Sequence, residues 1–380
     1  MQTTQYQWMA KTGWQPALPK PGTLVVDVAF CFGDSSVFEQ ETPLRSARAA
    51  FAPAPLFGCS TAGEIAGTRV SDRSLVVTVV HFAHTRVQPV AVSLAACGGD
   101  CAAAGERLAQ ALPPEDLAHV LVLSDGHQVN GSELVRGLLG CLPAGVTVTG
   151  GLAGDGTRFQ RTWVISDGAA IEGAVTTLGL YGQRLRVGYG SLGGWDAFGP
   201  ERRITRSRNN VLYQLDDQPA LALYKRYLGD YAHGLPATGL LFPLSVRLPA
   251  GGSEVVRTIL AVDEAEQSLT FAGDLPEGAY ARLMKANFDR VVDGAHAAAH
   301  ASYIAIGERS PELALLISCV GRRLVLKQRV EEELEAARDV LGAEATLTGF
   351  YSYGEICPSA PRADCQLHNQ TMTITTLSES

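Results

Sequence analysis

The chain has little charge and no excess of basic residues. Lys and Arg number 31 against 39 Asp and Glu, the formal net charge is −8, and charged side chains make up 18% of the 380 residues. Without a basic field there is little to attract a nucleic-acid backbone or an anionic membrane surface. The composition therefore argues against nucleic acid and membrane as main partners and leaves small molecules and proteins.

Long hydrophobic runs and a secretion signal are also missing. The most apolar stretches, residues 239–244 and 313–320, are far shorter than the roughly 20 residues that a membrane-spanning helix needs. Residues 1–21 are polar and aromatic, with no basic start followed by an apolar run and no small-residue cleavage site. We therefore expect a soluble protein.

The eight cysteines do not have the spacing of a disulfide framework. Most of them lie in apolar or strand-like segments of the sequence. This placement is typical of cysteines that are reduced and pack as small hydrophobic side chains in the interior. Cys97 with Cys101, and Cys357 with Cys365 across a proline-containing loop, lack the paired CxxC spacing of a zinc site. The cysteines therefore favour a cytoplasmic protein without a structural metal.

The length and the 46% of hydrophobic residues are enough for a large core and exceed one average domain. We expect two tightly docked halves, because no long Pro- or Ser-rich linker separates them. Residues 1–24 are assigned to an N-terminal extension, 25–228 to an N-terminal domain and 229–380 to a C-terminal domain. The boundary region is expected at residues 229–239.

A glycine motif recurs along the sequence. Residues 58–65 (GCSTAGEI) and 349–356 (GFYSYGEI) share the pattern GxxxxGEI, and residues 150–155 (GGLAGD) form a looser, shorter copy that ends in Asp. One such motif is weak evidence, because glycine often only permits a tight turn with positive φ. Its recurrence with an acidic residue favours a binding surface.

Each copy of the motif follows the same order of expected elements. An apolar strand ends near a glycine, a helix follows, and the motif comes at the end of a second strand. The first strands are expected at 24–32, 120–123 and 313–320, and the helices at 43–51, 130–142 and 324–341. In the second copy, Asn130 or Ser132 is placed to cap the helix.

Continuous apolar strands joined by helices are typical of parallel neighbours with right-handed crossovers. We therefore predict an α/β fold of repeated βαβ units with mixed sheets, in two closely packed halves that share a cleft. Further helices are expected at 219–228 and 280–303, with β-like segments between the units. In such sheets ligands bind outside the carboxyl ends of the strands, where the glycine motifs are expected.

Together these motifs resemble those of the FIST family of sensory proteins, which have an N-terminal and a C-terminal FIST domain. Besides the glycine motifs, the resemblance rests on residues 124–126 (SDG), 130–134 (NGSEL), 198–202 (FGPER), 283–288 (LMKANF), 318–322 (SCVGR) and 367–373 (LHNQTMT). It implies a bacterial intracellular signalling protein whose paired domains bind a small ligand.

The resemblance also implies the kind of ligand and partner. The ligand would be an amino-acid-like molecule, or haem that senses nitric oxide. The partner would be a signalling protein such as a histidine kinase or a diguanylate cyclase or phosphodiesterase. Since the sequence shows no kinase, phosphoacceptor or cyclase motif, signalling is expected to run through a separate protein.

The acidic residues of the repeat are the central candidates for the ligand site. If Glu64, Asp155 and Glu355 face the cleft, they can accept hydrogen bonds from an amino or hydroxyl group while glycine amides receive a carboxylate. The alternative is that each carboxylate caps a neighbouring turn or helix. The full set of candidates is Gly58, Cys59, Ser60, Thr61, Gly63, Glu64, Gly150, Gly151, Gly154, Asp155, Gly349, Tyr351, Tyr353, Gly354 and Glu355.

Haem would need an axial ligand, usually His, Cys, Met or Tyr. The candidates that lie in or next to the motifs of the family resemblance are His368, His127 and Cys319. A structural, hydrogen-bonding role is the alternative for His368. Since no CxxCH attachment motif is present, any haem would be bound non-covalently.

Catalysis is the alternative to ligand sensing. Cys59 or Cys319 with His368 would suit acyl or amide transfer by a thiolate, although the text around Cys59 lacks the GxSxG of a nucleophile elbow. If residues 280–303 form one helix, Asp293, His296 and His300 share a face that a divalent metal could use, or that is an ordinary solvated surface. We favour a binding protein over an enzyme.

Overall fold

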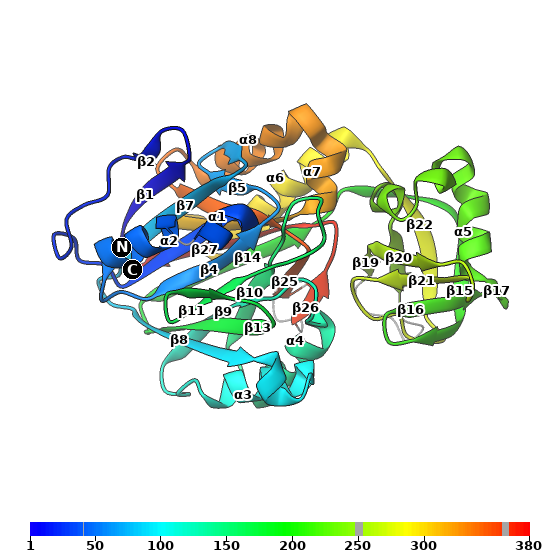
Figure 1. Ribbon diagram of the computed structural model, residues 1–380, viewed down its shortest axis with the longest axis horizontal. Helices are drawn as coiled ribbons and strands as arrows, with labels where there is room; N and C mark the ends of the chain where they lie inside the picture. The colour runs from blue at the N-terminus through cyan, green and yellow to red at the C-terminus, as the bar shows by residue number, and fades with distance from the viewer. Residues whose placement is uncertain (41, 248–253, 359–364) are drawn as a thin grey trace.

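The chain folds into a large body and a small lobe (Figure 1). The computed structural model describes residues 1–40, 42–247, 254–358 and 365–380. The body is made by residues 1–194 and 287–380, and the small lobe by residues 195–286. The predicted α/β class, with repeated βαβ units, mixed sheets and a two-domain organisation, is confirmed.

The first βαβ unit (28–61) has fully buried strands. It contains β3 (Val28–Asp34), α1 (Ser35–Gln40), α2 (Thr42–Phe51) and β4 (Leu56–Thr61). β3 and β4 pair in parallel, and every residue of both is buried. Strands that are covered on both faces consist almost entirely of apolar residues, which explains the apolar run at the start of this unit.

The second unit (117–152) begins its helix where the sequence predicts. It contains β9 (Leu117–Ser124), α4 (Gly131–Cys141) and β10 (Thr147–Leu152), and its strands pair in parallel. The side-chain oxygen of Asn130 accepts hydrogen bonds from the backbone N–H groups of Ser132 and Glu133. The predicted cap at Asn130 is confirmed.

The third unit (313–352) has two helices where one was predicted. It contains β23 (Leu313–Cys319), α7 (Val320–Leu326), the 3-10 turn η4 (Lys327–Arg329), α8 (Val330–Leu341) and β24 (Thr346–Ser352). The prediction of one helix over 324–341 is wrong, because Lys327 adopts φ 53° and interrupts the helical backbone. α7 also starts directly after β23, with Cys319 as its N-terminal flank.

Each unit receives a strand pair from another unit. β5 (Glu64–Ala66) and β6 (Arg69–Ser71) follow the first unit, and β5 pairs with β24 of the third. β11 (Val164–Ser166) and β12 (Ala169–Ile171) follow the second unit, and β11 pairs with β4 of the first. β25 (Gly354–Pro358) and β26 (Cys365–His368) follow the third unit, and β25 pairs with β10 of the second. The three units are therefore linked in a ring.

After each exchanged pair, the chain returns to its own sheet. β7 (Ser74–His81), β13 (Ala174–Tyr181) and β27 (Met372–Glu379) lie antiparallel to β3, β9 and β23. Beside them lie β1 (Gln2–Met9) with β2 (Gly13–Gln15), β8 (Arg86–Ser93) and β14 (Leu185–Leu192). The same order of strands thus recurs in three sheets.

Helices cover the outer faces of these sheets, and one core joins the units at the centre. η1 (Leu94–Cys97) and α3 (Cys101–Gln110) lie beside the second unit, and α6 (Phe288–Ala305) lies beside the third (Figure 1). In the central core Phe32 of β3 stacks on Phe350 of β24 with ring centroids 4.9 Å apart. Leu121 of β9 and Ile317 of β23 belong to the same cluster. Burial of these side chains stabilises the ring as a whole.

The small lobe has a sheet and a core of its own. Its elements are β15 (Trp195–Arg208), β16 (Val211–Leu215), β17 (Gln218–Pro219), α5 (Ala220–Leu228), η2 (Gly229–Gly234), η3 (Ala237–Leu241), β18 (Leu244–Arg247), β19 (Val255–Arg257), β20 (Ile259–Asp263), β21 (Ser268–Phe271) and β22 (Tyr280–Ala286). Residues 229–239, the expected boundary region, thus form η2 and part of η3 within this lobe.

The predicted helix over 280–303 is wrong in its first part. Residues 280–286 form β22, which pairs with β15 and β18, and α6 begins only at Phe288. The side chain of Asn287 accepts a hydrogen bond from the backbone N–H of Arg290 and so caps the helix. Ala281, Arg282 and Leu283 are buried, exposed and buried in turn, as in a strand, although Met284 is buried as well.

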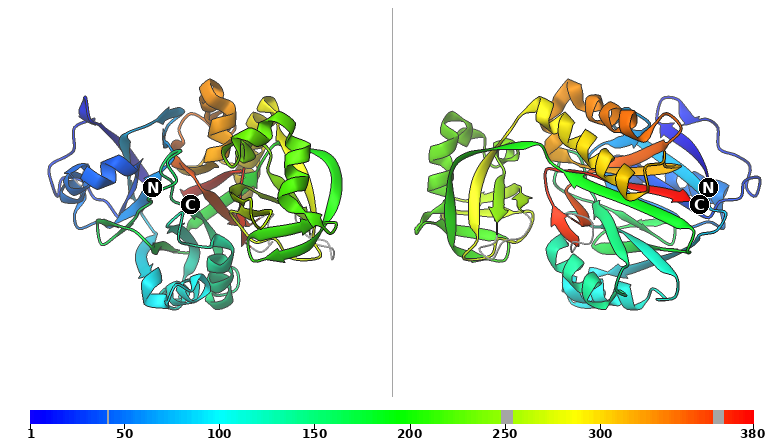
Figure 2. Two further views of the ribbon diagram at one scale, coloured as in Figure 1. Left: turned by 45° about the vertical axis from the view of Figure 1, so that its right-hand side comes forward. Right: turned by 180° about the vertical axis from the view of Figure 1, so that it is seen from behind.

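Two chain segments connect the lobe to the body, and Figure 2 shows them running beside each other. Residues 193 and 194 lead from β14 to β15, and Asn287 leads from β22 to α6. At Gly194 φ is 99°, and an added Cβ atom would stand 1.9 Å from the carbonyl oxygen of Arg290. Glycine is therefore required where the two connections meet.

The two ends of the chain lie together on the body (Figure 1). The N-terminal ammonium group of Met1 stands 2.7 Å from Oε1 of Glu312 and 3.4 Å from Oε2 of Glu379.

No helix in the described ranges is long and apolar enough to cross a membrane. The loop between Cys357 and Cys365 includes residues 359–364, which lie outside the described residues.

Candidate functional site

The first glycine of each repeat lies inside a strand and not in the turn that the sequence suggests. Gly58, Gly150 and Gly349 stand in β4, β10 and β24. At each of them an added Cβ atom would stand 1.8 Å from a carbonyl oxygen of the neighbouring parallel strand. Those oxygens belong to Cys31, Val122 and Leu316. These glycines are needed because two backbones approach closely.

Glu64 is fully buried and hydrogen-bonded within its own unit. The hydroxyl of Thr61 donates to Oε1, and the backbone N–H and hydroxyl of Ser74 donate to Oε2 at 3.2 and 2.7 Å. Burial raises the pKa of Glu64 to about 8, against the effect of these hydrogen bonds. The side chain thus joins the glycine motif to the start of β7.

Glu355 repeats this arrangement in the third unit. The hydroxyl of Ser352 donates to Oε1 at 2.6 Å, and the backbone N–H and hydroxyl of Thr371 donate to Oε2 at 3.2 and 3.0 Å. Burial again raises the pKa to about 8. Burial thus favours the protonated form of both glutamates, in which the carboxyl O–H donates to one of these neighbouring hydroxyls. The two side chains join equivalent segments of two units.

Asp155 has a different role, because it holds a loop. Its oxygens accept hydrogen bonds from the backbone N–H groups of residues 159–161 and from the hydroxyl of Tyr353. Burial acts to raise the pKa of Asp155, but the imidazole of His127, 3.8 Å from Oδ1, and the hydrogen bonds from Tyr353 and the backbone outweigh it and lower the pKa. Asp155 is therefore a carboxylate at neutral pH.

A cavity of about 720 Å³ opens where the three units meet, and we call it the three-unit cavity. It lies outside the carboxyl ends of β3 and β23, where α/β sheets bind ligands. Its lining consists of Asp34, Ala62, Asp72, Arg73, Asp155, Gly156, Thr157, Arg158, Val320, Arg323, Leu324, Lys327 and Val330.

Charges of both signs line this cavity. Two nitrogens of Arg323 contact the two carboxylate oxygens of Asp72 at 2.8 and 2.7 Å, and the guanidinium also donates to the carbonyl oxygen of Ala62. The hydrogen bonds from Arg323 lower the pKa of Asp72. Arg158 donates to the hydroxyl of Ser35 and lies 3.4 Å from Oδ1 of Asp34. Cations and carboxylates thus alternate around the opening.

Lys327 combines its place at this cavity with a strained backbone. Its φ of 53° and ψ of −116° lie outside the regions that residues with a side chain ordinarily adopt. Such strain is held by the surrounding structure and is common at ligand sites. The same break in the helix that the sequence did not predict therefore shapes the cavity wall.

The predicted site residues are only partly brought to the three-unit cavity. Asp155 lines it, whereas Glu64 and Glu355 lie in the neighbouring strands and do not. Other candidates make structural hydrogen bonds: the hydroxyl of Ser60 accepts the backbone N–H of Trp163 and joins the first unit to the segment after the second, whereas the hydroxyl of Tyr351 donates to Glu333 within the third unit. The remaining candidates stand in the three glycine motifs around these residues.

Sequence reasoning missed most of the charged lining. The missed residues are Asp34, Asp72, Arg73, Arg158, Arg323 and Lys327. One signal was available: Asp34 ends a predicted strand, Arg158 shortly follows a glycine motif, and Arg323 directly follows the SCVGR segment. Charged residues just after strand ends would have identified three of the six.

The candidate axial ligands do not fit a haem group. Nε2 of His368 donates to the carbonyl oxygen of Cys357 at 2.9 Å, and burial lowers the pKa of this histidine to about 4. The ring of His127 packs edge-on against Tyr353. Cys319 is buried, and none of the three candidates is among the described residues that line the three-unit cavity.

The cysteines proposed for catalysis lack the features of an activated thiol. Cys59 and Cys319 are 0% and 2% exposed, and burial raises the pKa of both. The thiolate is the nucleophile, so a raised pKa opposes acyl transfer at neutral pH. Within the described ranges, no group of three His, Cys, Asp or Glu side chains is placed to hold a metal ion. This includes Asp293, His296 and His300 on α6.

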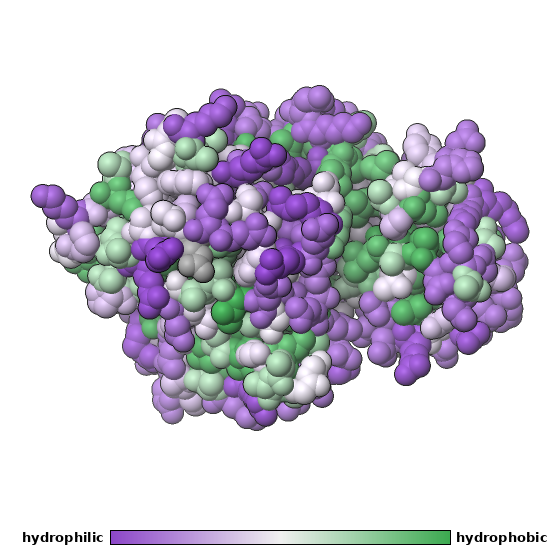
Figure 3. Space-filling model, viewed as in Figure 1, coloured by the Kyte–Doolittle hydropathy of each residue, from purple (hydrophilic) through white to green (hydrophobic). Residues whose placement is uncertain are grey.

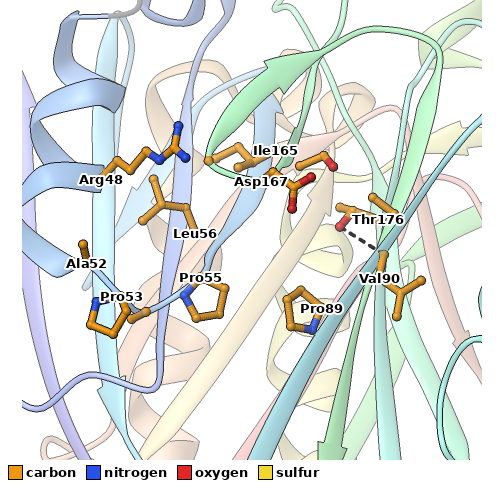
Figure 4. A pocket seen from close by; sticks show the side chains of 14 residues that line it. Arg48, Ala52, Pro53, Pro55, Leu56, Pro89, Val90, Ile165, Asp167 and Thr176 are labelled. Atoms are coloured by element: carbon orange, nitrogen blue, oxygen red, sulfur yellow. Dashed lines mark hydrogen bonds between the residues drawn. The ribbon is translucent and has the colours of Figure 1, made fainter.

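A separate cavity of about 450 Å³ lies between α2, β8 and the β11–β12 turn (Figure 4). Arg48 and Asp167 stand at one side of it, and Pro53, Pro55 and Pro89 at the other. None of the residues predicted from the sequence lines it. Its walls come from two units only, so it does not share the convergence of the three-unit cavity.

Two family models cover most of the chain. The FIST N domain matches residues 27–218, and the FIST C domain matches residues 220–358. The chain belongs to the FIST family. FIST domains are sensory domains that bind small ligands and occur in signalling proteins. The boundary between the two matched FIST domains falls at β17, so the small lobe contains residues of both.

Two solved structures align with this FIST protein over nearly the whole chain, but their sequence identity to it is low. A cyanuric acid hydrolase from A. caulinodans has 9% sequence identity and a TM-score of 0.40, with 99% of each chain covered. A chorismatase has 11% identity and a TM-score of 0.34, with 99% of this chain and 98% of that chain covered. No curated protein matches the sequence. At this distance no activity is transferred from either enzyme.

Proposed function

We propose that this FIST protein senses a small zwitterionic, amino-acid-like ligand that binds in the three-unit cavity. The observation that carries the proposal is the lining itself, which comes from all three units and presents guanidinium, ammonium and carboxylate groups together. A zwitterion needs both signs of charge within a few ångströms, and charge-assisted hydrogen bonds are the strong ones. The cavity volume also suits a small molecule.

The two ends of such a ligand would meet different walls. Arg158 and Arg323 offer guanidinium groups for the carboxylate, and planar guanidinium groups bind carboxylates through two parallel hydrogen bonds. Asp34, whose side chain is largely buried, offers a carboxylate for the amino group. Entry of the ligand would replace part of the Arg158–Asp34 and Arg323–Asp72 pairing, so binding reorganises contacts between units.

The response would pass to a separate signalling protein such as a histidine kinase or a diguanylate cyclase or phosphodiesterase. The occurrence of FIST domains in signalling proteins supports this part of the proposal. α7 gives a route, because Arg323 and Leu324 line the cavity while Val325 packs with Trp195 and Met284 of the small lobe. A change at the cavity would therefore act on the contact between body and lobe.

The test is a thermal-shift screen of the protein against the standard L-amino acids, followed by titration calorimetry of those that stabilise it. Binding should require both ends of the ligand, so the matching amine without a carboxylate and the matching acid without an amine should fail to compete. Asp34→Asn and Arg158→Gln should each weaken binding by about tenfold or more. Arg48→Gln, at the separate cavity of Figure 4, is the matched control. Unchanged binding in both cavity variants would rule out this site.

A further inference from the structure

A second cavity lies between the small lobe and the body. It measures about 580 Å³, and we call it the inter-lobe cavity. α4 and β26 supply its body side, and β18, β19 and the segment after β21 supply its lobe side. Figure 3 shows the groove between the two parts and the apolar residues that gather on the side of the lobe facing the body. Ligand sites occur preferentially at such junctions.

Most of the wall of the inter-lobe cavity is apolar. Val135 and Leu139 of α4 face it from the body, and Val246 and Val255 face it from the lobe. Leu367 of β26 completes this surface. A ligand that fills the space must therefore be largely hydrocarbon or aromatic, because a polar molecule would lose its hydration without compensation.

One wall carries a buried guanidinium group that has no carboxylate bonded to it among the described residues. Arg257 is 6% exposed. Its Nε donates to the carbonyl oxygen of Asp274, and its Nη1 donates to those of Val256 and Leu367. These bonds leave Nη2 available. Burial lowers the pKa of Arg257 to about 10, while the nearby Asp274 acts against this, so the side chain is charged at neutral pH.

The carboxylate of Asp274, which acts on the charge of Arg257, also lines the cavity and is hydrogen-bonded to α4's capping residue. Oδ1 of Asp274 accepts a hydrogen bond from Nδ2 of Asn130 at 3.0 Å. Arg136 of α4 lines the same cavity and adds a second positive charge. The hydroxyl of Ser132, also in the lining, is buried without a hydrogen-bond partner in the described residues. Among the described lining residues two arginines stand against one aspartate, so the polar part combines a net positive charge with a hydroxyl that has no partner there.

We propose that the inter-lobe cavity binds an apolar monocarboxylate, with the carboxylate against Arg257 and Ser132 and the hydrocarbon part against the valines and leucines of α4 and the lobe. A carboxylate supplies the partner that a buried guanidinium ordinarily has, and the apolar wall accounts for the rest of the ligand. The proposal is independent of the three-unit cavity, because the two cavities share no residue.

Binding at this junction also stabilises the docking of the lobe. Arg257 already joins the lobe to the body through the carbonyl oxygen of Leu367, and Gln370 of the body donates to the carbonyl oxygen of Leu240 in the lobe. A ligand seated between them contacts both parts at once. It therefore binds the docked arrangement more tightly than any arrangement with the lobe moved away.

The experiment compares octanoate with octanamide by titration calorimetry on the whole chain. The two probes share a hydrocarbon chain, so their difference isolates the carboxylate. Octanoate should bind saturably and octanamide should bind about tenfold or more weakly. Naphthalene-2-carboxylate, used as a third probe, distinguishes a planar ligand from a linear one.

Variants place the binding in the inter-lobe cavity. Leu139→Trp fills it from α4 and should abolish octanoate binding, whereas Thr157→Trp fills the three-unit cavity from a loop outside α7 and should leave octanoate binding unchanged. Arg257→Gln should remove the preference for octanoate over octanamide, a ratio that a general loss of stability does not change. If Leu139→Trp fails to fold, Ser132→Leu replaces it.

Three results would overturn the proposal: no binding of either acid, equal binding of octanoate and octanamide, or octanoate binding that survives in the filled variant. Loss of amino-acid binding in Thr157→Trp with octanoate binding retained separates failure at one cavity from failure at the other. An octanoate site that responds to Thr157→Trp and not to Leu139→Trp would place the acid in the three-unit cavity and would also refute the inter-lobe assignment.

Discussion

Glu64→Gln is expected to change how the stability of the protein depends on pH. Burial raises the pKa of Glu64 from 4.5 to about 8, so the folded protein keeps a proton over this range that the unfolded chain has released. The stabilising contribution of Glu64 is fully present below its pKa in the unfolded chain, and it is lost as the pH rises through its pKa in the folded protein. The free energy of unfolding should therefore fall by about 1.4 kcal/mol per pH unit because of this one group.

Over the whole interval the effect amounts to roughly 5 kcal/mol, which is a large part of the stability of a typical domain. Glutamine has nearly the same shape and carries no titrating proton. It also keeps an acceptor and a donor beside Thr61 and Ser74, the two partners of Glu64. The variant should thus lose less stability than the native protein when the pH is raised.

Urea unfolding at about pH 5.5, 6.5 and 7.5 measures this difference. The slope of stability against pH should be less negative in Glu64→Gln by about 1.4 kcal/mol per unit. Glu335→Gln, which removes an exposed carboxylate, controls for the loss of one surface charge. Identical slopes in the native protein and Glu64→Gln would show that Glu64 is already ionised in the folded state and would refute the reasoning.

Two further changes test contacts inside the third unit. Gly349→Ala places a methyl group 1.8 Å from the carbonyl oxygen of Leu316 and should lower the free energy of unfolding by more than about 3 kcal/mol or prevent folding. Gly140→Ala, whose added methyl group meets no atom within 4 Å, is the control and should be tolerated. Circular dichroism and urea unfolding distinguish the two variants. Arg322→Met removes the guanidinium from a fully buried pair with Glu333, which joins α7 to α8, and should lower the free energy of unfolding by about 3–5 kcal/mol. A loss below about 1 kcal/mol would refute a stabilising role for this pair.

The units of the fold could be predicted from sequence because their signals are local. Buried parallel strands carry continuous apolar text, as in β3 and β23, and a capping side chain such as Asn130 marks the start of a helix. The strand pairs that pass between units could not be predicted. Strands as short as β5 and β11 carry no readable period, and their partners lie far away in the sequence.

The candidate site was predicted less well than the fold, for a physical reason. The glycine motif is the clearest pattern in the sequence, but its first glycine serves the close approach of two strands and not a ligand-binding turn. Glu64 and Glu355 satisfy their hydrogen bonds with nearby hydroxyl and N–H groups. The charges at the three-unit cavity come from single residues at the ends of separate elements, so no spacing in the sequence connects them.

The ring of exchanged strand pairs has a consequence for how this protein associates. If a strand pair such as β5–β6 leaves its position, β24 is left with a free edge, and the same pair from another molecule fits that edge equally well. Exchange within one chain and exchange between chains use the same contacts and differ only in concentration and connectivity. Partial opening at high concentration therefore favours domain-swapped oligomers built on native pairing, and a swapped dimer would keep both of the sheets that meet at each exchanged pair.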